Sequence, residues 1–186
     1  MPEKIEAEFI ENFLIVWDSK KGSELYQSGF YGKPVGIPKP KEPEFDVPLI
    51  LDLMESLYLV EKGLLTVFEG PERVKVGLRK LRGRARRLYD EFDLKFAVYR
   101  DLRDHGLIVT PGIKYGCDFA VYKHGPGVEH APYMVSVKKW DETITATDIV
   151  KAGRLATTVR KRFIIATPSP QAKDQIQYLI FKWFKA

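Results

Sequence analysis

Two short stretches near the N-terminus concentrate apolar residues: residues 4–10, where they alternate with glutamates, and residues 13–17, which are continuously apolar. Both patterns are typical of strands, and Asn12 between them favours a tight turn. Residues 19–28 are predicted to form a short helix that ends at Gly29. The chain is therefore expected to begin with a pair of strands and a helix.

Proline interrupts the pattern next, because five of the twelve prolines fall in residues 33–48. Proline lacks a backbone N–H and fixes φ, so this segment is expected to be an extended ordered loop or a linker. After it, Asp46 is expected to cap a helix over residues 48–62 that closes at Gly63. A strand at residues 64–68 would complete this part of the chain.

The rest of the chain alternates helices and strands. A helix is predicted over residues 89–105, stopped by Gly106, and a second helix follows Thr147. Strands are predicted around them at residues 107–110, 117–123, 133–139, 163–167 and 177–184. This order predicts a mixed sheet with packed helices, and therefore the α+β class.

The same pattern predicts the domain organisation. Residues 1–70 are expected to form a small N-terminal α/β domain, residues 71–88 a basic connecting segment, and residues 89–186 a C-terminal mixed-sheet domain. At 186 residues, with 45% hydrophobic residues, the chain is long enough to bury a substantial core.

The helix after Thr147 carries two rows of residues with the same spacing. One row is apolar: Ile149, Ala152, Ala156 and Val159. The other row is mostly basic and lies two residues later: Lys151, Arg154, Thr158 and Lys161. Two residues correspond to about 200° of helix rotation, so the rows are expected on opposite faces. Arg154 and Lys161 are therefore predicted to share a solvent-facing surface.

Charge divides unevenly along the chain. Residues 1–70 contain 7 Lys and Arg against 13 Asp and Glu, whereas residues 71–186 contain 23 against 12. Such asymmetry predicts a polyanionic partner for the second part. The densest basic stretch comprises Arg73, Lys75, Arg79, Lys80, Arg82, Arg84, Arg86 and Arg87. We expect Arg82 and Arg84 to contact phosphate, although such stretches are commonly only solvated faces.

Several classes of protein are disfavoured by composition. No apolar run approaches the roughly 18 residues of a membrane span, and the N-terminus lacks the apolar region of a signal peptide, so a cytoplasmic location is expected. Cys117 is the single cysteine, which excludes an internal disulfide and favours a small buried hydrophobe. The three histidines are scattered, so neither a metal site nor a cofactor is predicted.

Candidate chemistry lies in residues 112–119, Gly-Ile-Lys-Tyr-Gly-Cys-Asp-Phe, together with His130 and Lys161. RNA can be cut without a metal if a base removes the 2′-hydroxyl proton, an acid protonates the leaving 5′-oxygen and a cation stabilises charge on phosphorus. His130 suits the acid and Lys161 the cation. Tyr115, a phenol with an ordinary pKa of about 10, is a base only where a cation favours its phenolate.

Each of these side chains also has an ordinary structural explanation. A tyrosine between glycines is typical of a turn residue whose ring lies at the edge of a core, and Lys161 is typical of a solvated charge near a helix end. No single one of them identifies a site.

The chain as a whole resembles the catalytic subunit of the archaeal tRNA-splicing endonuclease. The stretches that carry the resemblance are residues 22–26, 29–32, 96–106, 112–122, 130–137 and 154–161. They cover nearly the whole chain. The resemblance implies a C-terminal nuclease domain that is similar to restriction endonucleases.

It also implies roles for individual residues. Tyr115 would be the general base, His130 the general acid and Lys161 the clamp on the transition state. The activity would be that of a tRNA-intron lyase, cutting precursor tRNA at bulge-helix-bulge junctions and leaving 2′,3′-cyclic phosphate and 5′-hydroxyl ends. Arg154, seven residues before Lys161, would stack on a flipped base, and Lys151 would contact RNA beside it.

Two departures from the family bear on RNA contacts and partners. A second stacking arginine is not evident near the C-terminus, where Lys173 or Trp183 would substitute. Residues 168–174 lack the acidity of the docking loop in homotetrameric members, which favours an α2β2 heterotetramer with a structural paralogue over a homotetramer. The loop bearing Lys39 and Lys41 resembles an insertion expected to touch RNA; a packed surface loop is the alternative.

The sequence leaves two other functions open. One is a non-catalytic RNA-binding or assembly subunit of the same complex. The other is a metal-dependent nuclease in which Asp118 holds the ion. That site would need a second carboxylate two residues before Lys138, where the chain has Ser136.

Overall fold

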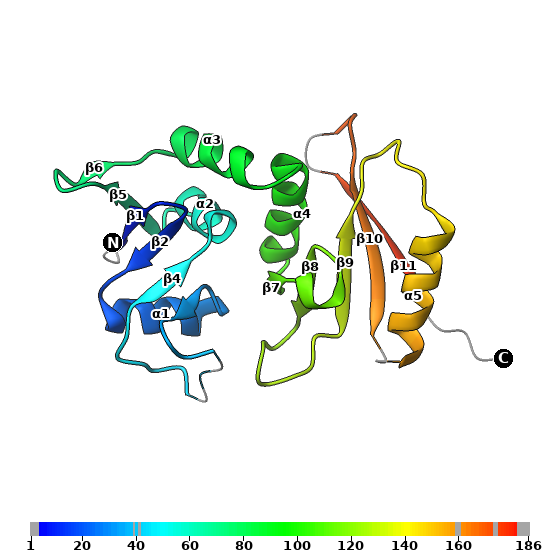
Figure 1. Cartoon of the computed structure of the whole chain (residues 1–186), viewed down its shortest axis with the longest axis horizontal. Coiled ribbons are helices and arrows are strands. Elements are labelled where there is room, and N and C mark those ends of the chain that lie inside the picture. Colours follow the sequence, from blue (N-terminus) through cyan, green and yellow to red (C-terminus); the bar gives the residue numbers. More distant parts are fainter. Residues whose placement is uncertain (1–3, 39, 41, 159–160, 173–174, 182–186) are drawn as a thin grey trace. The chain divides into compact units, whose positions relative to one another are not determined.

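The computed structural model describes residues 4–38, 40, 42–158, 161–172 and 175–181. The chain divides into two compact units, Met1–Phe92 and Asp93–Ala186. Each unit has its own sheet with helices packed on it (Figure 1). Both sheets mix parallel and antiparallel strands, which confirms the predicted α+β class. None of the described helices is long and apolar enough to cross a membrane.

The first unit is built on a six-stranded sheet in the order β3-β4-β2-β1-β5-β6. Its elements are β1 (Ile5–Ile10), β2 (Phe13–Val16), α1 (Ser19–Gly29), β3 (Lys33–Pro34), β4 (Leu49–Leu51), α2 (Leu53–Glu61), β5 (Leu65–Glu69), β6 (Val74–Lys75) and α3 (Leu78–Leu88). Only β1 and β5 pair in parallel among these strands. The predicted hairpin at the N-terminus is confirmed, with Glu11 in the left-handed region at its turn.

The predicted helix over residues 48–62 is wrong in its first part. Leu49–Leu51 forms β4 and pairs with β2, because Leu49 and Leu51 point into the core while Ile50 faces outward. The helix that follows begins after Asp52, whose carboxylate accepts the backbone N–H of Glu55 in a capping box. Asp46, the predicted cap, accepts the Ser19 hydroxyl instead. The proline-rich segment 33–48 is irregular as predicted except at its start, where Lys33–Pro34 forms β3 by pairing with β4; the described residues between these two strands form no helix or strand.

Residues 71–88, predicted to be a basic segment connecting two domains, belong to the first unit in the structure. Most of it forms β6 and α3 in the first unit, and α3 packs on α2 through Leu81 and Ala85, both fully buried. The structure divides the chain after Phe92, whereas the order of predicted elements placed the end of the N-terminal domain at residue 70 and the start of the C-terminal domain at residue 89. The predicted helix over 89–105 starts only at Phe92, after Glu91 takes a positive φ.

The second unit contains a five-stranded sheet in the order β11-β10-β9-β8-β7. Its elements are α4 (Phe92–Asp104), β7 (Ile108–Pro111), the 3₁₀ turn η1 (Ile113–Tyr115), β8 (Phe119–Tyr122), β9 (Tyr133–Val137), α5 (Ala146–Thr158), β10 (Arg162–Pro168) and β11 (Ile176–Phe181). Figure 1 shows α4 along one face of this sheet and α5 along the other. Met134 and Phe163 are fully buried between the sheet and α5.

The connection from β9 through α5 to β10 positions the site. Strands β9 and β10 are parallel neighbours, with Arg162 opposite Tyr133. Parallel neighbours need a crossover, here supplied by α5, and their first residues meet at the same edge of the sheet. The residues just before β9 and just before β10 are therefore brought together.

Replacing Asp52 by Ala should lower the free energy of unfolding by about 1 kcal/mol, because the first turn of α2 loses its capping box. Urea denaturation of the full-length protein measures this change. Asp46→Ala is the matched control, since among the described residues its carboxylate accepts the Ser19 hydroxyl in a bond at the surface, and it should change stability much less. Equal losses in the two variants would contradict the assignment of the cap.

Candidate active site

Tyr115 lies in a tight turn between β7 and β8. Its backbone N–H donates to the Gly112 carbonyl at 2.8 Å, and Gly116 closes the turn with φ 64°, donating to the Ile113 carbonyl at 2.9 Å. A β-carbon on Gly112 would lie 2.6 Å from the Cys117 sulfur, so only glycine fits there. Burial raises the pKa of the Cys117 thiol to about 11, which agrees with its predicted role as a buried hydrophobe. The hydrogen bonds of the turn therefore fix the backbone position of Tyr115.

Lys161 lies directly before β10 and is 8% exposed. Its Nζ is 5.1 Å from the centroid of the Tyr115 ring and donates a hydrogen bond to the Ala131 carbonyl at 2.5 Å. Burial, with a smaller effect from the charge of Lys114, lowers the pKa of the Lys161 ammonium below its ordinary value. Within the described part of the chain, no carboxylate forms an ion pair with it.

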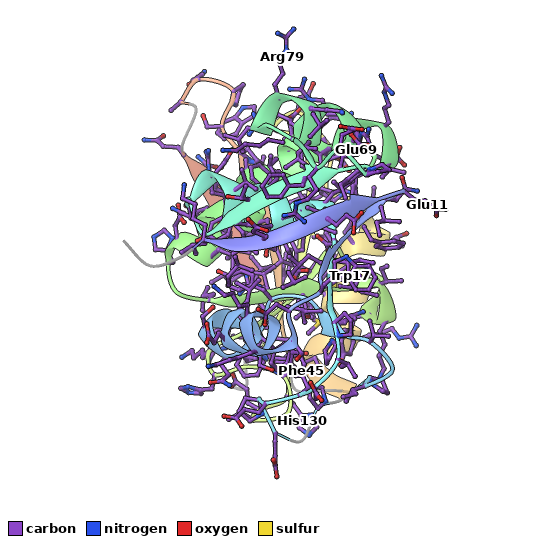
Figure 2. All side chains as sticks on the ribbon, turned by 90° about the vertical axis from the view of Figure 1, so that its left-hand side faces the viewer. Glu11, Trp17, Phe45, Glu69, Arg79 and His130 are labelled. Atoms are coloured by element: carbon purple, nitrogen blue, oxygen red, sulfur yellow. The ribbon has the colours of Figure 1, made fainter. Side chains whose placement is uncertain are left out.

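His130 lies in the loop between β8 and β9, one residue before the carbonyl that Lys161 binds, and its side chain is exposed (Figure 2). Glu129 stabilises this loop, because its Oε1 accepts the backbone N–H groups of Lys123 at 2.5 Å and His124 at 2.7 Å. These bonds, chiefly the one from His124, lower the pKa of the Glu129 carboxyl. Lys161 thus touches the Tyr115 ring and the segment that carries His130.

The arrangement combines three chemical properties. The Tyr115 ring is half-buried against the core cluster that includes Met134 and Phe163, the Lys161 ammonium is desolvated, and His130 is open to solvent. A cation in a site with little water acts strongly on a neighbouring phenol and on any bound anion. The geometry therefore suits chemistry at a phosphate group.

The prediction that Lys161 lies on the solvent-facing surface of a helix is wrong. Helix α5 ends at Thr158, so Lys161 follows the helix, is buried, and does not share a solvent-facing helix surface with the exposed Arg154. The two rows do not divide cleanly either, since Ala152 is fully buried but Ile149 is 54% exposed. Lys151, expected on the solvent side, donates a hydrogen bond to the Gly116 carbonyl in the Tyr115 turn.

The basic residues expected to contact RNA lie in different surroundings. Arg82 pairs with Glu61 at 3.0 Å, and Arg84 pairs with Glu69 at 2.5 Å while its guanidinium lies over the Phe9 ring. Figure 2 shows Arg79, on the same helix, reaching away from the first unit. Four candidates lie outside the described residues: Lys39, Lys41, Lys173 and Trp183.

Asp118 uses both carboxylate oxygens to hold the fold together. Oδ1 lies 3.0 Å from the ammonium of Lys95 on α4, and Oδ2 accepts the backbone N–H of Val137 at 2.8 Å. Across the residues that the structure describes, no three His, Cys, Asp or Glu side chains gather as a metal-binding group. The donor set around Asp118 is therefore that of a structural link between α4, β8 and β9.

Two residues near the site were not identified from the sequence. Lys114 adds a second positive charge close enough to depress the pKa of Lys161, and Glu129 braces the loop of His130. Adjacency to Tyr115 and to His130 was the only signal available for them. Their contacts depend on the folded path of the chain.

Comparison with known proteins identifies the family. Residues 92–178 match the family described as tRNA intron endonuclease, catalytic C-terminal domain, and residues 5–81 match its N-terminal domain. A tRNA-splicing endonuclease of Hyperthermus butylicus is 50% identical over 171 residues, covering 92% of this chain and 93% of that protein. Those of Saccharolobus islandicus and Saccharolobus solfataricus are each 40% identical over 182 residues, covering 97% of this chain and 99% of theirs. The chain belongs to the tRNA intron endonuclease family.

The lowered pKa of Lys161 predicts how stability depends on pH. Between its folded pKa and the ordinary value of 10.5, the unfolded chain binds more protons at this residue than the folded chain. The contribution of Lys161 to the free energy of unfolding should therefore rise with pH in that window, and be constant below it. As the pH increases from 8 to about 10.5, the urea concentration at the unfolding midpoint should increase less for Lys161→Met than for the wild type. Parallel curves would show that Lys161 is not desolvated.

Proposed function

We propose that this chain is the catalytic subunit of a tRNA-splicing endonuclease, a tRNA-intron lyase that cuts precursor tRNA at bulged intron–exon junctions. The observation that carries the proposal is the buried Lys161 ammonium, which contacts the Tyr115 ring and the Ala131 carbonyl beside His130. Membership of the family and the names of its relatives support the same substrate.

The proposed reaction needs no metal and no cofactor. The Tyr115 phenolate takes the proton of the 2′-hydroxyl at the junction, and the freed oxygen attacks the adjacent phosphorus. His130, protonated, gives its proton to the 5′-oxygen as the bond from phosphorus to that oxygen breaks. The products are a 2′,3′-cyclic phosphate and a 5′-hydroxyl, and the proton lost from the 2′-hydroxyl is held by Tyr115.

Lys161 has two tasks in this scheme. Its Nζ, 5.1 Å from the centroid of the Tyr115 ring, places a positive charge beside the proposed base, and this charge stabilises the extra negative charge on phosphorus in the transition state. A lysine already neutralised by a carboxylate would do neither well. Lys114 adds positive charge to the same place, which strengthens binding of the phosphate before reaction.

Recognition of the RNA is proposed to come from outside this centre. Arg154 is exposed on α5, and its planar guanidinium would stack on a base of the bulge. Basic residues of α3, including Arg82 and Arg84, would contact phosphates elsewhere on the precursor, and Lys39 and Lys41 are further candidates. Ion pairs with Glu61 and Glu69 reduce what Arg82 and Arg84 can contribute.

Assembly and location are proposed from the sequence. Without an acidic docking loop in residues 168–174, this chain would combine with a structural paralogue that supplies the loop, giving an α2β2 heterotetramer; a homotetramer is the alternative. The complex would work in the cytoplasm.

Cleavage of a bulge-helix-bulge RNA should persist in excess EDTA and leave 2′,3′-cyclic phosphate and 5′-hydroxyl ends. His130→Ala should lower turnover by about 10² to 10⁴, the usual contribution of a general acid, with little loss of RNA binding. Single-turnover kinetics and end-group analysis measure both.

His105→Ala is the matched control, because that histidine is exposed in the turn directly after α4 and its ring is bonded to the Asp101 carbonyl, so its loss should leave turnover unchanged. Complete inactivation by EDTA would favour a metal-dependent nuclease using Asp118. Unaltered turnover in His130→Ala would remove that residue from the mechanism, and RNA binding without cleavage under every condition would indicate a non-catalytic subunit.

The purified chain alone should be a monomer or dimer with little activity, because residues 168–174 lack the acidic docking loop through which its copies would associate. Adding a structural paralogue with an acidic loop should restore both a tetramer and cleavage, and high salt should weaken that contact. Light scattering with a cleavage assay tests this. A stable, active tetramer of this chain by itself would overturn the proposed heterotetramer.

A further inference from the structure

Lys151 connects helix α5 to the turn that carries Tyr115, 35 residues away in sequence. Its ammonium donates a hydrogen bond to the backbone carbonyl of Gly116, the residue directly after Tyr115. The approach is close along the end of the side chain, since a β-carbon built on Gly116 would lie 3.6 Å from Nζ and 3.7 Å from Cε of Lys151. The lysine therefore lies against the turn itself.

The surroundings of the ammonium agree with this placement. Nζ is 5.8 Å from the centroid of the ring of Phe163, a fully buried residue of β10. Its charge also reaches the buried Cys117 thiol, where it partly offsets the effect of burial on the pKa. Lys151 is thus directed toward the sheet and the turn, unlike the solvent-facing orientation expected from helical spacing.

The contact complements the bonds inside the turn. Tyr115, Gly116 and Cys117 donate their backbone N–H groups to Gly112, Ile113 and Gly112 respectively, which sets the shape of the turn. The hydrogen bond from Lys151 sets where this turn lies against α5 and β10. Because Lys161 directly precedes β10, that placement decides how the Tyr115 ring meets the Lys161 ammonium.

We infer that Lys151 is a positioning residue for Tyr115, which it holds beside Lys161 through the Gly116 carbonyl, and that RNA contact is not its task. The inference rests on the proposed function, in which the Tyr115 phenol is the general base. One proton of the ammonium is committed to the Gly116 oxygen, and the ring of Phe163 covers one side of it. A contact that orients a reacting group acts on turnover, since a displacement of about 1 Å can cost as much as 10²-fold.

Lys151→Met should lower the single-turnover rate of the full-length chain, assembled as the wild type requires, by about 10- to 100-fold. Affinity for the bulge-helix-bulge RNA should change less than about threefold, with the same salt dependence. Lys151→Arg keeps a donor and should recover most of the rate. Lys20→Met, which removes an exposed lysine of α1, is the matched control and should behave as the wild type.

A lysine that touched phosphate would give the opposite pattern. Lys151→Met would then weaken RNA binding and lower the slope of log affinity against log salt by about one, with little change in the bound rate. That result would overturn the inference. Melting temperatures measured on the same samples separate a positioning role from loss of the fold, since Lys151→Met should remain folded at the assay temperature.

A double-mutant cycle with Tyr115→Phe tests whether Lys151 acts through Tyr115. If it does, adding Lys151→Met to Tyr115→Phe should cause little further loss, because the group to be positioned is already gone. Independent, additive losses would assign Lys151 another role. Full activity of Tyr115→Phe would instead refute the proposed mechanism, so the two failures are distinguishable.

Hydrogen exchange gives a readout that does not depend on catalysis. Lys151→Met should accelerate exchange of the backbone amides of Tyr115, Gly116 and Cys117, whose bonds hold the turn closed. Amides of β8, which are bonded within the sheet, and the Lys20→Met protein should exchange as in the wild type. Unchanged exchange in the turn of Lys151→Met would overturn the inference whether or not the protein cleaves RNA.

Discussion

The site depends on the contacts of the buried Lys161 ammonium with the Ala131 carbonyl and the Tyr115 ring. Taking an ammonium out of water is unfavourable, and a neighbouring carboxylate normally compensates for it. Here the described contacts are a carbonyl, that of Ala131, and an aromatic ring, that of Tyr115, so the charge stays available. The lowered pKa of Lys161 is the physical sign of this cost. A site that leaves a cation uncompensated is prepared for an anionic ligand, and a phosphate is the anion that RNA supplies.

The crossover β9-α5-β10 explains how residues distant in sequence meet there. Two lysines, Lys151 within α5 and Lys161 just after it, reach back to backbone carbonyls of two different loops, at Gly116 and Ala131. Each carbonyl adjoins a proposed catalytic residue. Backbone carbonyl oxygens are present whatever the side chain, so these two contacts depend on the lysines. Loss of either lysine should affect the geometry of the proposed catalytic centre more than the stability of the fold.

Charge in the first unit is more balanced than the basic stretch suggests. Glu69 accepts from both Lys80 and Arg84, and these contacts, chiefly the one from Lys80, lower the pKa of its carboxyl. Helix α3 therefore uses part of its positive charge to dock on its own unit. Exposed basic residues such as Arg79 remain for contact with a polyanion. Counting charges along a chain overestimates the positive electrostatic potential that RNA would meet, because acidic residues from distant segments neutralise some of the basic ones.

The α+β class, the N-terminal hairpin and the places of the strands along the second unit could be predicted from the sequence because they follow from local periodicity, whereas the candidate triad came from the resemblance to a known family. The sequence did not reveal β4, since three residues are too few to show a period and Leu49–Leu51 is a strand only through pairing with β2. The surroundings of Lys161 and Lys151 were decided only by the tertiary structure. Helical spacing was extended to Lys161, beyond the bounds of α5, whereas contacts with distant loops, which no local pattern encodes, bury Lys161 and bring Lys151 to the Gly116 carbonyl.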